Sequence, residues 1–258
     1  MLLADKVEME ERLARPHEGF DPYGAVCEAA RGAGIEVHAW FCLYIERVDR
    51  PTSAVRRHPE YLLVNRYRRH NTEQPTWSTV SESYSTYWVC PSAEGYRDFL
   101  SELMKAVVER YDVAGIHLDY VRYPEEVEGR YYCYCERCRR RYKEEYGYEL
   151  PADDVIKNRY YISTMCENVS SAVEHFSKLA RSLGRKISAY VFTDYVTAIE
   201  ACYQDWPYFS RFLDTLIITA YEVEGRYAGT LVRRAEAVSD RRCRIAAAVY
   251  SLPHVRRS

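Results

Sequence analysis

The chain has 258 residues, which suits one β/α barrel of about 250 residues or two small domains. Its formal net charge is −2, so electrostatics do not favour a nucleic-acid partner. No apolar run approaches the roughly 20 residues that span a bilayer, and the opening residues turn acidic too early for a signal peptide. We therefore expect no membrane partner and a cytoplasmic location, unless a signal precedes this chain.

Strand-length apolar runs alternate with helical patterns along the chain. Asp21-Pro22 is typical of a helix start and Gly32 of a helix end. Apolar residues at helical spacing predict further helices over 96–111 and 162–179. This alternation is typical of a parallel sheet. The predicted strands are Glu36–Tyr44, Gly115–Tyr123, Lys186–Asp194, Thr215–Glu222 and Arg244–Ser251.

These patterns predict an α/β fold, a parallel (β/α)8 TIM barrel that forms a single domain over residues 1–258. Five strands are visible where a closed barrel needs eight, so we expect an incomplete barrel that contains strands three to seven. The missing strands would lie before Asp21 and after Ser251. Residues 45–90 lack clear periodicity and are predicted to form a long loop of the kind that shapes active sites.

The predicted strand Gly115–Tyr123 carries the strongest functional signal. Because side chains alternate along a strand, His117 and Asp119 project from one side of it. Catalytic groups of β/α barrels lie at the carboxyl ends of the strands, which makes Asp119 a candidate catalytic residue. The alternative is an aspartate that caps the next helix or pairs with Arg122.

Four segments of the chain together resemble a known family of glycosyl-hydrolase-like barrels, the "family 10 glycosylhydrolase" proteins. The segments are Phe20–Pro22, Gly34–Phe41, Arg110–Pro124 and Tyr203–Trp206. The resemblance implies a barrel that hydrolyses glycosidic bonds, with bacterial cell-wall or related polysaccharide glycans as substrates. In its register His38, Asp119 and Glu222 lie at the ends of the third, fourth and sixth strands.

Glycosidases usually place two carboxyl groups on either side of the bond that they cleave. We assign Asp119 as nucleophile or base and Glu222 as the acid, with Asp194 in reserve because it also ends a predicted strand. A chitinase-like barrel is a rival within this class, but Val121 occupies the place of the catalytic glutamate of its Asp-x-Asp-x-Glu motif.

The sequence thus predicts a glycoside hydrolase that cleaves O-glycosidic bonds of a polysaccharide by a two-carboxylate mechanism. The alternative is a non-catalytic carbohydrate-binding barrel or an inactive fragment of a glycosidase. Aromatic and hydrogen-bonding side chains near the strand ends are predicted to bind the carbohydrate. They are His38, Trp40, Tyr44, His117, Tyr120, Arg122, Tyr123 and Tyr221.

A cysteine motif follows the Asp119 strand, within a predicted insertion at residues 125–155. Cys133, Cys135 and Cys138 have the spacing of one face of a tetrahedral zinc site. Cys90 is the natural fourth ligand, because consecutive β/α loops of a barrel are spatial neighbours. The arrangement also resembles the zinc cluster of family-42 β-galactosidases. Four thiolates leave no open position for water, so we predict a structural zinc ion.

Three other interpretations of the cysteine motif stay open. The chain has nine cysteines, an odd number that suits free thiols better than a secreted disulfide framework, so reduced cysteines without a metal are one alternative. An iron–sulfur cluster also takes four thiolates. A zinc-ribbon nucleic-acid module would use the basic run at 137–143, but an exposed helical face explains that run.

Overall fold

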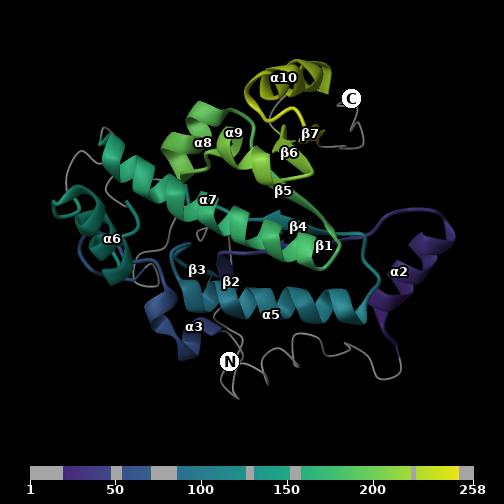
Figure 1. Cartoon of the computed structure of the whole chain (residues 1–258), viewed down its shortest axis with the longest axis horizontal. Helices are drawn as coiled ribbons and strands as arrows, with labels where there is room; N and C mark the ends of the chain where they lie inside the picture. The colour runs from purple at the N-terminus through teal and green to yellow at the C-terminus, as the bar shows by residue number, and fades with distance from the viewer. Residues whose placement is uncertain are drawn as a thin grey trace, which may run out of the picture.

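A parallel sheet forms the centre of the molecule (Figure 1). This computed structural model describes residues 20–47, 54–70, 86–125, 131–151, 158–221 and 225–249. Within these residues five strands pair in the order β1-β4-β5-β6-β7, and each pair is parallel. All five predicted strands are present, each shorter than its apolar run. They are β1 His38–Cys42, β4 Gly115–Asp119, β5 Lys186–Phe192, β6 Thr215–Thr219 and β7 Arg244–Ala248.

Helices connect consecutive strands of this sheet and form a layer beside it. The Asp21 side chain caps the first described helix by accepting a hydrogen bond from the Gly24 N–H at 3.1 Å, which confirms the predicted start. No described helix is long and apolar enough to cross a bilayer. The first helix, α2 Pro22–Gly32, precedes β1, and the helices that follow strands are α5 Glu94–Arg110, α7 Arg159–Ser182, α8 Tyr195–Cys202, α9 Trp206–Phe209, η3 Ser210–Phe212 and α10 Gly225–Val238.

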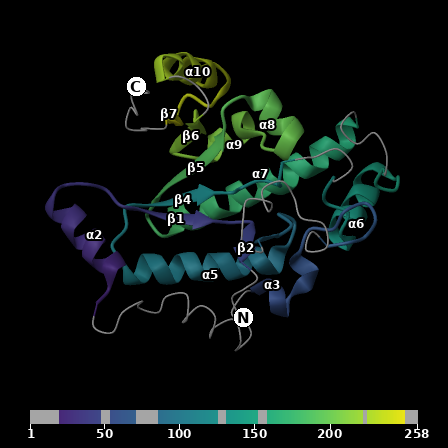
Figure 2. The same ribbon diagram turned by 180° about the vertical axis from the view of Figure 1, so that it is seen from behind.

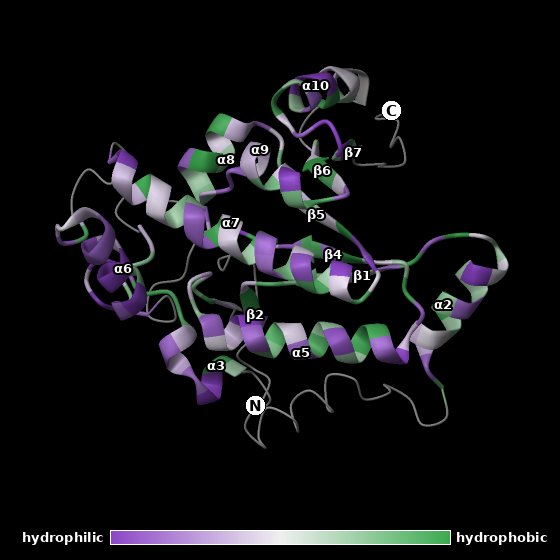
Figure 3. Cartoon of the chain, viewed as in Figure 1, coloured by the Kyte–Doolittle hydropathy of each residue, from purple (hydrophilic) through white to green (hydrophobic). Residues whose placement is uncertain are grey.

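The two faces of the sheet differ in burial. Ile116, Leu118 and Leu216 belong to the face that packs in the core, and all three are fully buried. The long helices α5 and α7 run side by side along the sheet in both views (Figures 1 and 2), and green apolar positions recur along them in Figure 3. Burying a large aliphatic side chain contributes about 1.5–3 kcal/mol, so this layer stabilises the fold. On the other face, Trp40 stays 62% exposed.

The segment predicted as an irregular loop, 45–90, contains regular structure, which corrects that prediction. β2 pairs antiparallel with β3, and Ile45 lies opposite Trp88. Trp88 is fully buried, so apolar packing stabilises this short strand pair, whose strands are too short to give a periodic pattern in the sequence. The elements here are β2 Ile45–Arg47, α3 Ala54–Arg57, η1 Pro59–Tyr61 and β3 Thr86–Trp88, and α6 Glu136–Tyr146 follows the cysteine motif.

Candidate active site and cysteine cluster

The carboxyl ends of the parallel strands meet at one edge of the sheet and border a hollow of about 380 Å³. Cys42 at the end of β1 pairs in register with Asp119 at the end of β4. Five of the predicted site residues, Trp40, Asp119, Tyr120, Arg122 and Tyr221, therefore come together here. The full lining is Trp40, Cys42, Asp119, Tyr120, Arg122, Glu125, Tyr190, Val191, Phe192, Gln204, Thr219 and Tyr221.

The Asp119 carboxylate is held by one donor on each oxygen. The Tyr120 backbone N–H donates to Oδ1 at 2.7 Å, and the Trp40 indole N–H donates to Oδ2 at 3.0 Å. Partial burial raises the pKa of Asp119, while these two hydrogen bonds and the nearby Arg122 charge oppose the rise. A raised pKa makes the carboxylate a stronger base or nucleophile, and its position in an open hollow leaves it accessible to a ligand.

Arg122 brings a positive charge to the same hollow. Its guanidinium lies over the rings of Trp88, Tyr120 and Phe192 at 5.1, 5.3 and 5.0 Å from their centroids. One guanidinium nitrogen lies 3.8 Å from a Glu125 carboxylate oxygen, and the Arg122 side chain is only 13% exposed. Three rings and an acid thus fix the orientation of this cation beside Asp119.

A sharp turn after β4 separates the side chains of the Asp119 motif. Tyr120 has φ +51°, a left-handed conformation that is uncommon for a residue other than glycine. Gln204 braces the turn: its side-chain oxygen accepts from the Phe192 N–H at 3.1 Å, and its side-chain nitrogen donates to the Val121 carbonyl at 3.4 Å. Gln204 is buried, so its polar atoms hold the backbone that surrounds the hollow.

His117 lies on the same face of β4 as Asp119 but borders a second, adjoining hollow together with Trp40 and Tyr190. One ring nitrogen, Nδ1, is 2.8 Å from the Ser188 hydroxyl oxygen. Burial, assisted by the neighbouring His38, lowers the pKa of His117 to about 4. His117 is therefore neutral at pH 7 and supports the site without a charge.

Besides His117, three of the predicted sugar-binding residues lie outside the lining of the strand-end hollow, which corrects their assignment. His38 is the first residue of β1 and pairs with Gly115, so it lies at the amino end of the sheet, opposite Asp119. Tyr44 and Tyr123 are fully buried, Tyr44 near the ring of Tyr96 and Tyr123 beside the cysteine cluster. A tyrosine without exposed surface has no face to offer a sugar.

Of the two candidates for the second carboxyl group, Asp194 and Glu222, the structure describes only Asp194. Asp194 caps α8: its carboxylate accepts from the Thr197 N–H at 2.9 Å and from the Thr197 hydroxyl at 3.1 Å, and it is not part of the hollow's lining. Glu222 lies outside the described residues. Sequence reasoning overlooked Glu125, an acid that lines the hollow and follows directly on the Asp119 motif.

The structure confirms that Cys90, Cys133, Cys135 and Cys138 come together. Their sulfur atoms all lie within 4.8 Å of one another, and all four residues are buried. The Cys90 sulfur is 3.6 Å from that of Cys138 and 3.9 Å from that of Cys135. A tetrahedral ion with zinc–sulfur bonds of about 2.3 Å requires sulfur–sulfur distances of about 3.8 Å, so the four thiols fit such an ion.

Donors around the cluster suit negatively charged sulfur. The backbone N–H groups of Val64 and Cys135 point at the Cys133 sulfur at 3.5 and 3.4 Å. The Asn168 amide donates to the Cys138 sulfur at 3.6 Å and to the Tyr123 hydroxyl at 3.1 Å. Hydrogen bonds of this kind orient metal ligands and stabilise thiolates, so the surroundings of the cluster match its donor set.

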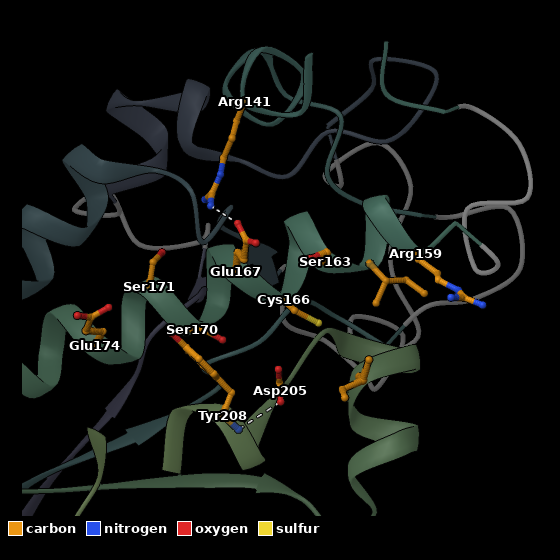
Figure 4. Close-up of a pocket in the computed structure, with 12 residues that line it drawn as sticks. Arg141, Arg159, Ser163, Cys166, Glu167, Ser170, Ser171, Glu174, Asp205 and Tyr208 are labelled. Atoms are coloured by element: carbon orange, nitrogen blue, oxygen red, sulfur yellow. Dashed lines mark hydrogen bonds and ion pairs between the residues drawn. The ribbon is translucent and has the colours of Figure 1, made fainter. Parts of the chain in front are cut away.

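A larger hollow, of about 600 Å³, lies on the outer side of the helical layer (Figure 4). Three of its charged residues are engaged with neighbours: Arg141 on α6 pairs with Glu167 on α7 at 2.5 Å, and Asp205 caps α9 through the Tyr208 N–H. Cys166 on α7 borders it, but burial raises the pKa of this thiol well above its ordinary value, so it stays protonated. We assign no chemistry to this surface.

A comparison of the sequence with protein families identifies the family of the chain. The family "Glycosyl hydrolase-like 10" matches residues 3–254, almost the whole chain. The chain belongs to this glycosyl hydrolase-like family. Among curated proteins, none matches the chain.

Two solved structures share the fold of this family member. A cycloisomaltooligosaccharide glucanotransferase from Paenibacillus sp., complexed with cycloisomaltoheptaose, matches with a TM-score of 0.54 at 13% identity over 86% of this chain and 27% of its own. A β-galactosidase from the psychrophilic Marinomonas ef1 matches with a TM-score of 0.56 at 14% identity over 84% of this chain and 38% of its own.

The chain therefore spans about a quarter to two fifths of the length of these two proteins. At such low identity the likeness establishes the fold and leaves the activity open. Together with the parallel sheet and its helical layer, it identifies a β/α barrel fold, with a sheet that does not close within the described residues.

Proposed function

We propose that this protein is a glycoside hydrolase that cleaves O-glycosidic bonds of a polysaccharide or cell-wall glycan, with Asp119 as nucleophile or base. The observation that carries the proposal is the position of Asp119. Its carboxylate is oriented by two donors at the carboxyl end of β4, inside a hollow lined by aromatic rings. In β/α barrel enzymes, catalytic residues come from these strand ends.

The lining of the hollow supports a carbohydrate ligand. Trp40 and Tyr221 present exposed rings, which bind the apolar C–H faces of sugars, and Arg122 adds hydrogen-bond donors for sugar hydroxyl groups. A glycosidase also needs a second carboxyl group. We propose Glu222 for this role, because it follows Tyr221, a residue of the lining. The family match and the glycoside-active fold neighbours support the same class of substrate.

The test is the release of reducing ends from cell-wall glycan and from a panel of soluble polysaccharides, with purified full-length chain. We expect Asp119→Asn and Glu222→Gln to lower kcat by about 10²- to 10⁴-fold, the usual loss for a catalytic carboxyl group. Asp194→Asn is the matched control. Asparagine caps a helix as well as aspartate does, so this variant keeps the wild-type rate.

Wild-type rates in both Asp119→Asn and Glu222→Gln would refute the assignment. Calorimetric titration with the same glycans measures binding and so distinguishes the proposed hydrolase from the alternative function. Binding without turnover by the wild-type chain would identify a non-catalytic carbohydrate-binding barrel.

We further propose that the cysteine cluster holds one structural zinc ion. The support is the all-sulfur donor set, its burial and its tetrahedral spacing. Four protein ligands leave no position for a substrate, so zinc would tie β3, which precedes Cys90, to the segment that begins α6. The contact of Tyr123 with Cys90, at 3.7 Å, would connect this tie to the loop that follows Asp119.

A further inference from the structure

Trp40 is an unusual tryptophan in this fold. Two other tryptophans, Trp88 and Trp206, are buried in the core, whereas Trp40 is 62% exposed on the open face of the sheet. Its indole N–H is nevertheless hydrogen-bonded: it donates to the Asp119 carboxylate at 3.0 Å. Single exposed aromatic side chains are common on protein surfaces, so the feature of Trp40 that needs a reason is its hydrogen bond to Asp119 and not its exposure.

Neighbouring strands fix the orientation of the indole ring. Tyr190 on β5 meets it edge to face, with centroids 5.8 Å apart, and His117 on β4 does so at 6.2 Å. His117 and Tyr190 also contact each other at 4.3 Å, and the Ser188 hydroxyl lies 2.8 Å from the His117 ring. Residues on three adjacent strands therefore hold the indole, with its N–H toward Asp119 and part of its surface open.

The hydrogen bond from Trp40 completes the orientation of Asp119. The Tyr120 N–H already holds Oδ1, but a single donor leaves the carboxylate free to rotate about its Cβ–Cγ bond. The second donor, on Oδ2, removes that freedom. Both donors favour the ionised form of the carboxylate, and they come from the sheet and the turn that also form the hollow.

We propose that Trp40 is a positioning residue for Asp119: its indole N–H fixes the reactive carboxylate, while its exposed ring receives the sugar next to the bond that is cleaved. This inference rests on the proposed role of Asp119. It assigns two separable contributions to one side chain. The N–H acts on the chemical step, and the ring acts on binding.

Replacing Trp40 by 3-benzothienylalanine tests the N–H alone, because sulfur takes the place of the N–H in a ring of the same shape. We expect kcat to fall about tenfold, as for a lost hydrogen bond to a charged group, with KM changed less than about twofold. Trp40→Ala also removes the ring, so we expect it to raise KM about tenfold in addition. Tyr208→Phe, on the outer surface, is the matched control and keeps wild-type values.

A measurement without substrate separates this inference from the proposed function. The side-chain carboxyl carbon of Asp119, assigned by its loss in Asp119→Asn, is titrated by NMR. Removing the N–H donor raises the pKa of Asp119, because the donor stabilises the carboxylate. An upward shift in the benzothienylalanine protein supports the inference even if the chain hydrolyses no glycan tested. A titration that coincides with that of the wild-type protein would overturn it.

Discussion

The strand-end hollow and the cysteine cluster lie on the two sides of one short segment, yet they are built in opposite ways. Asp119 faces an open hollow, whereas Tyr123, four residues later, is buried with its hydroxyl against the Cys90 sulfur. In the cluster the four reactive atoms face one another. In the hollow, the carboxylate has two donors and open space in front of it. A closed donor set can only stabilise, whereas an open one can act on a ligand.

The largest effect is expected from breaking the closed region. Cys138→Ser removes a ligand, so zinc should fall from about one ion per chain to near zero, and the free energy of unfolding should fall by about 4 kcal/mol or more. Metal analysis and urea unfolding measure the two quantities. Cys166→Ser is the control, since Cys166 is a buried thiol outside the cluster, and it keeps the metal.

Equal metal content in Cys138→Ser and Cys166→Ser would contradict the zinc proposal. The cluster would then be a group of packed thiols. The contrast between a closed and an open region would lose its chemical basis.

A smaller effect is expected at the boundary of the open region, where His117 is buried without charge. Its folded pKa of about 4 lies below the unfolded value near 6.5, so the unfolded chain binds more protons between these values. Stability contributed by neutral His117 is complete above pH 6.5 and is lost as the pH falls towards 4, by roughly 3 kcal/mol.

Urea unfolding at pH 7, 5.5 and 4.5 measures this loss of stability in the wild-type chain and in His117→Gln, which has no titrating ring at this position. The wild-type chain should lose more stability than the variant over that range. Acid release of a metal affects both proteins equally and cancels in the difference. Parallel pH curves would mean that His117 is charged or exposed, and that the open face extends further than the hollow.

The sequence was sufficient for the features that depend on local spacing. Alternation of apolar runs predicted the five strands, and the helix-start signal at Asp21-Pro22 matched α2. The Cys-x-Cys-x-x-Cys motif predicted three residues of the cluster, and the rule that consecutive barrel loops are spatial neighbours predicted the fourth, Cys90. Each inference needed only the periodicity of an element or the order of neighbouring loops.

The side chains that sequence reasoning misplaced depend on register and backbone turns. The register of the family resemblance placed His38 at the end of a strand, whereas His38 is the first residue of β1 and lies at the other end of the sheet. The left-handed turn at Tyr120 sends Tyr123 into the core, which no pattern of residue types indicates. Asp194 carried a readable signal, since Thr197 follows it at the spacing of a helix cap.

The smallest expected effect is the change in stability when Asp119 is replaced. It shows whether Asp119 stabilises the fold at all, as the cysteine cluster does. Burial raises its pKa, so the ionised carboxylate costs the folded state stability, and this cost grows as the pH rises above the ordinary carboxyl value near 4. Asp119→Asn removes the cost. It should therefore be more stable than the wild-type chain at pH 7, by about 1 kcal/mol, and lose this advantage near pH 3. Thermal unfolding at both pH values measures the difference.

A lower stability of Asp119→Asn at pH 7 would show that Asp119 stabilises the fold, as the cysteines do. A higher stability together with a loss of activity would show that Asp119 serves the reaction at a cost in stability.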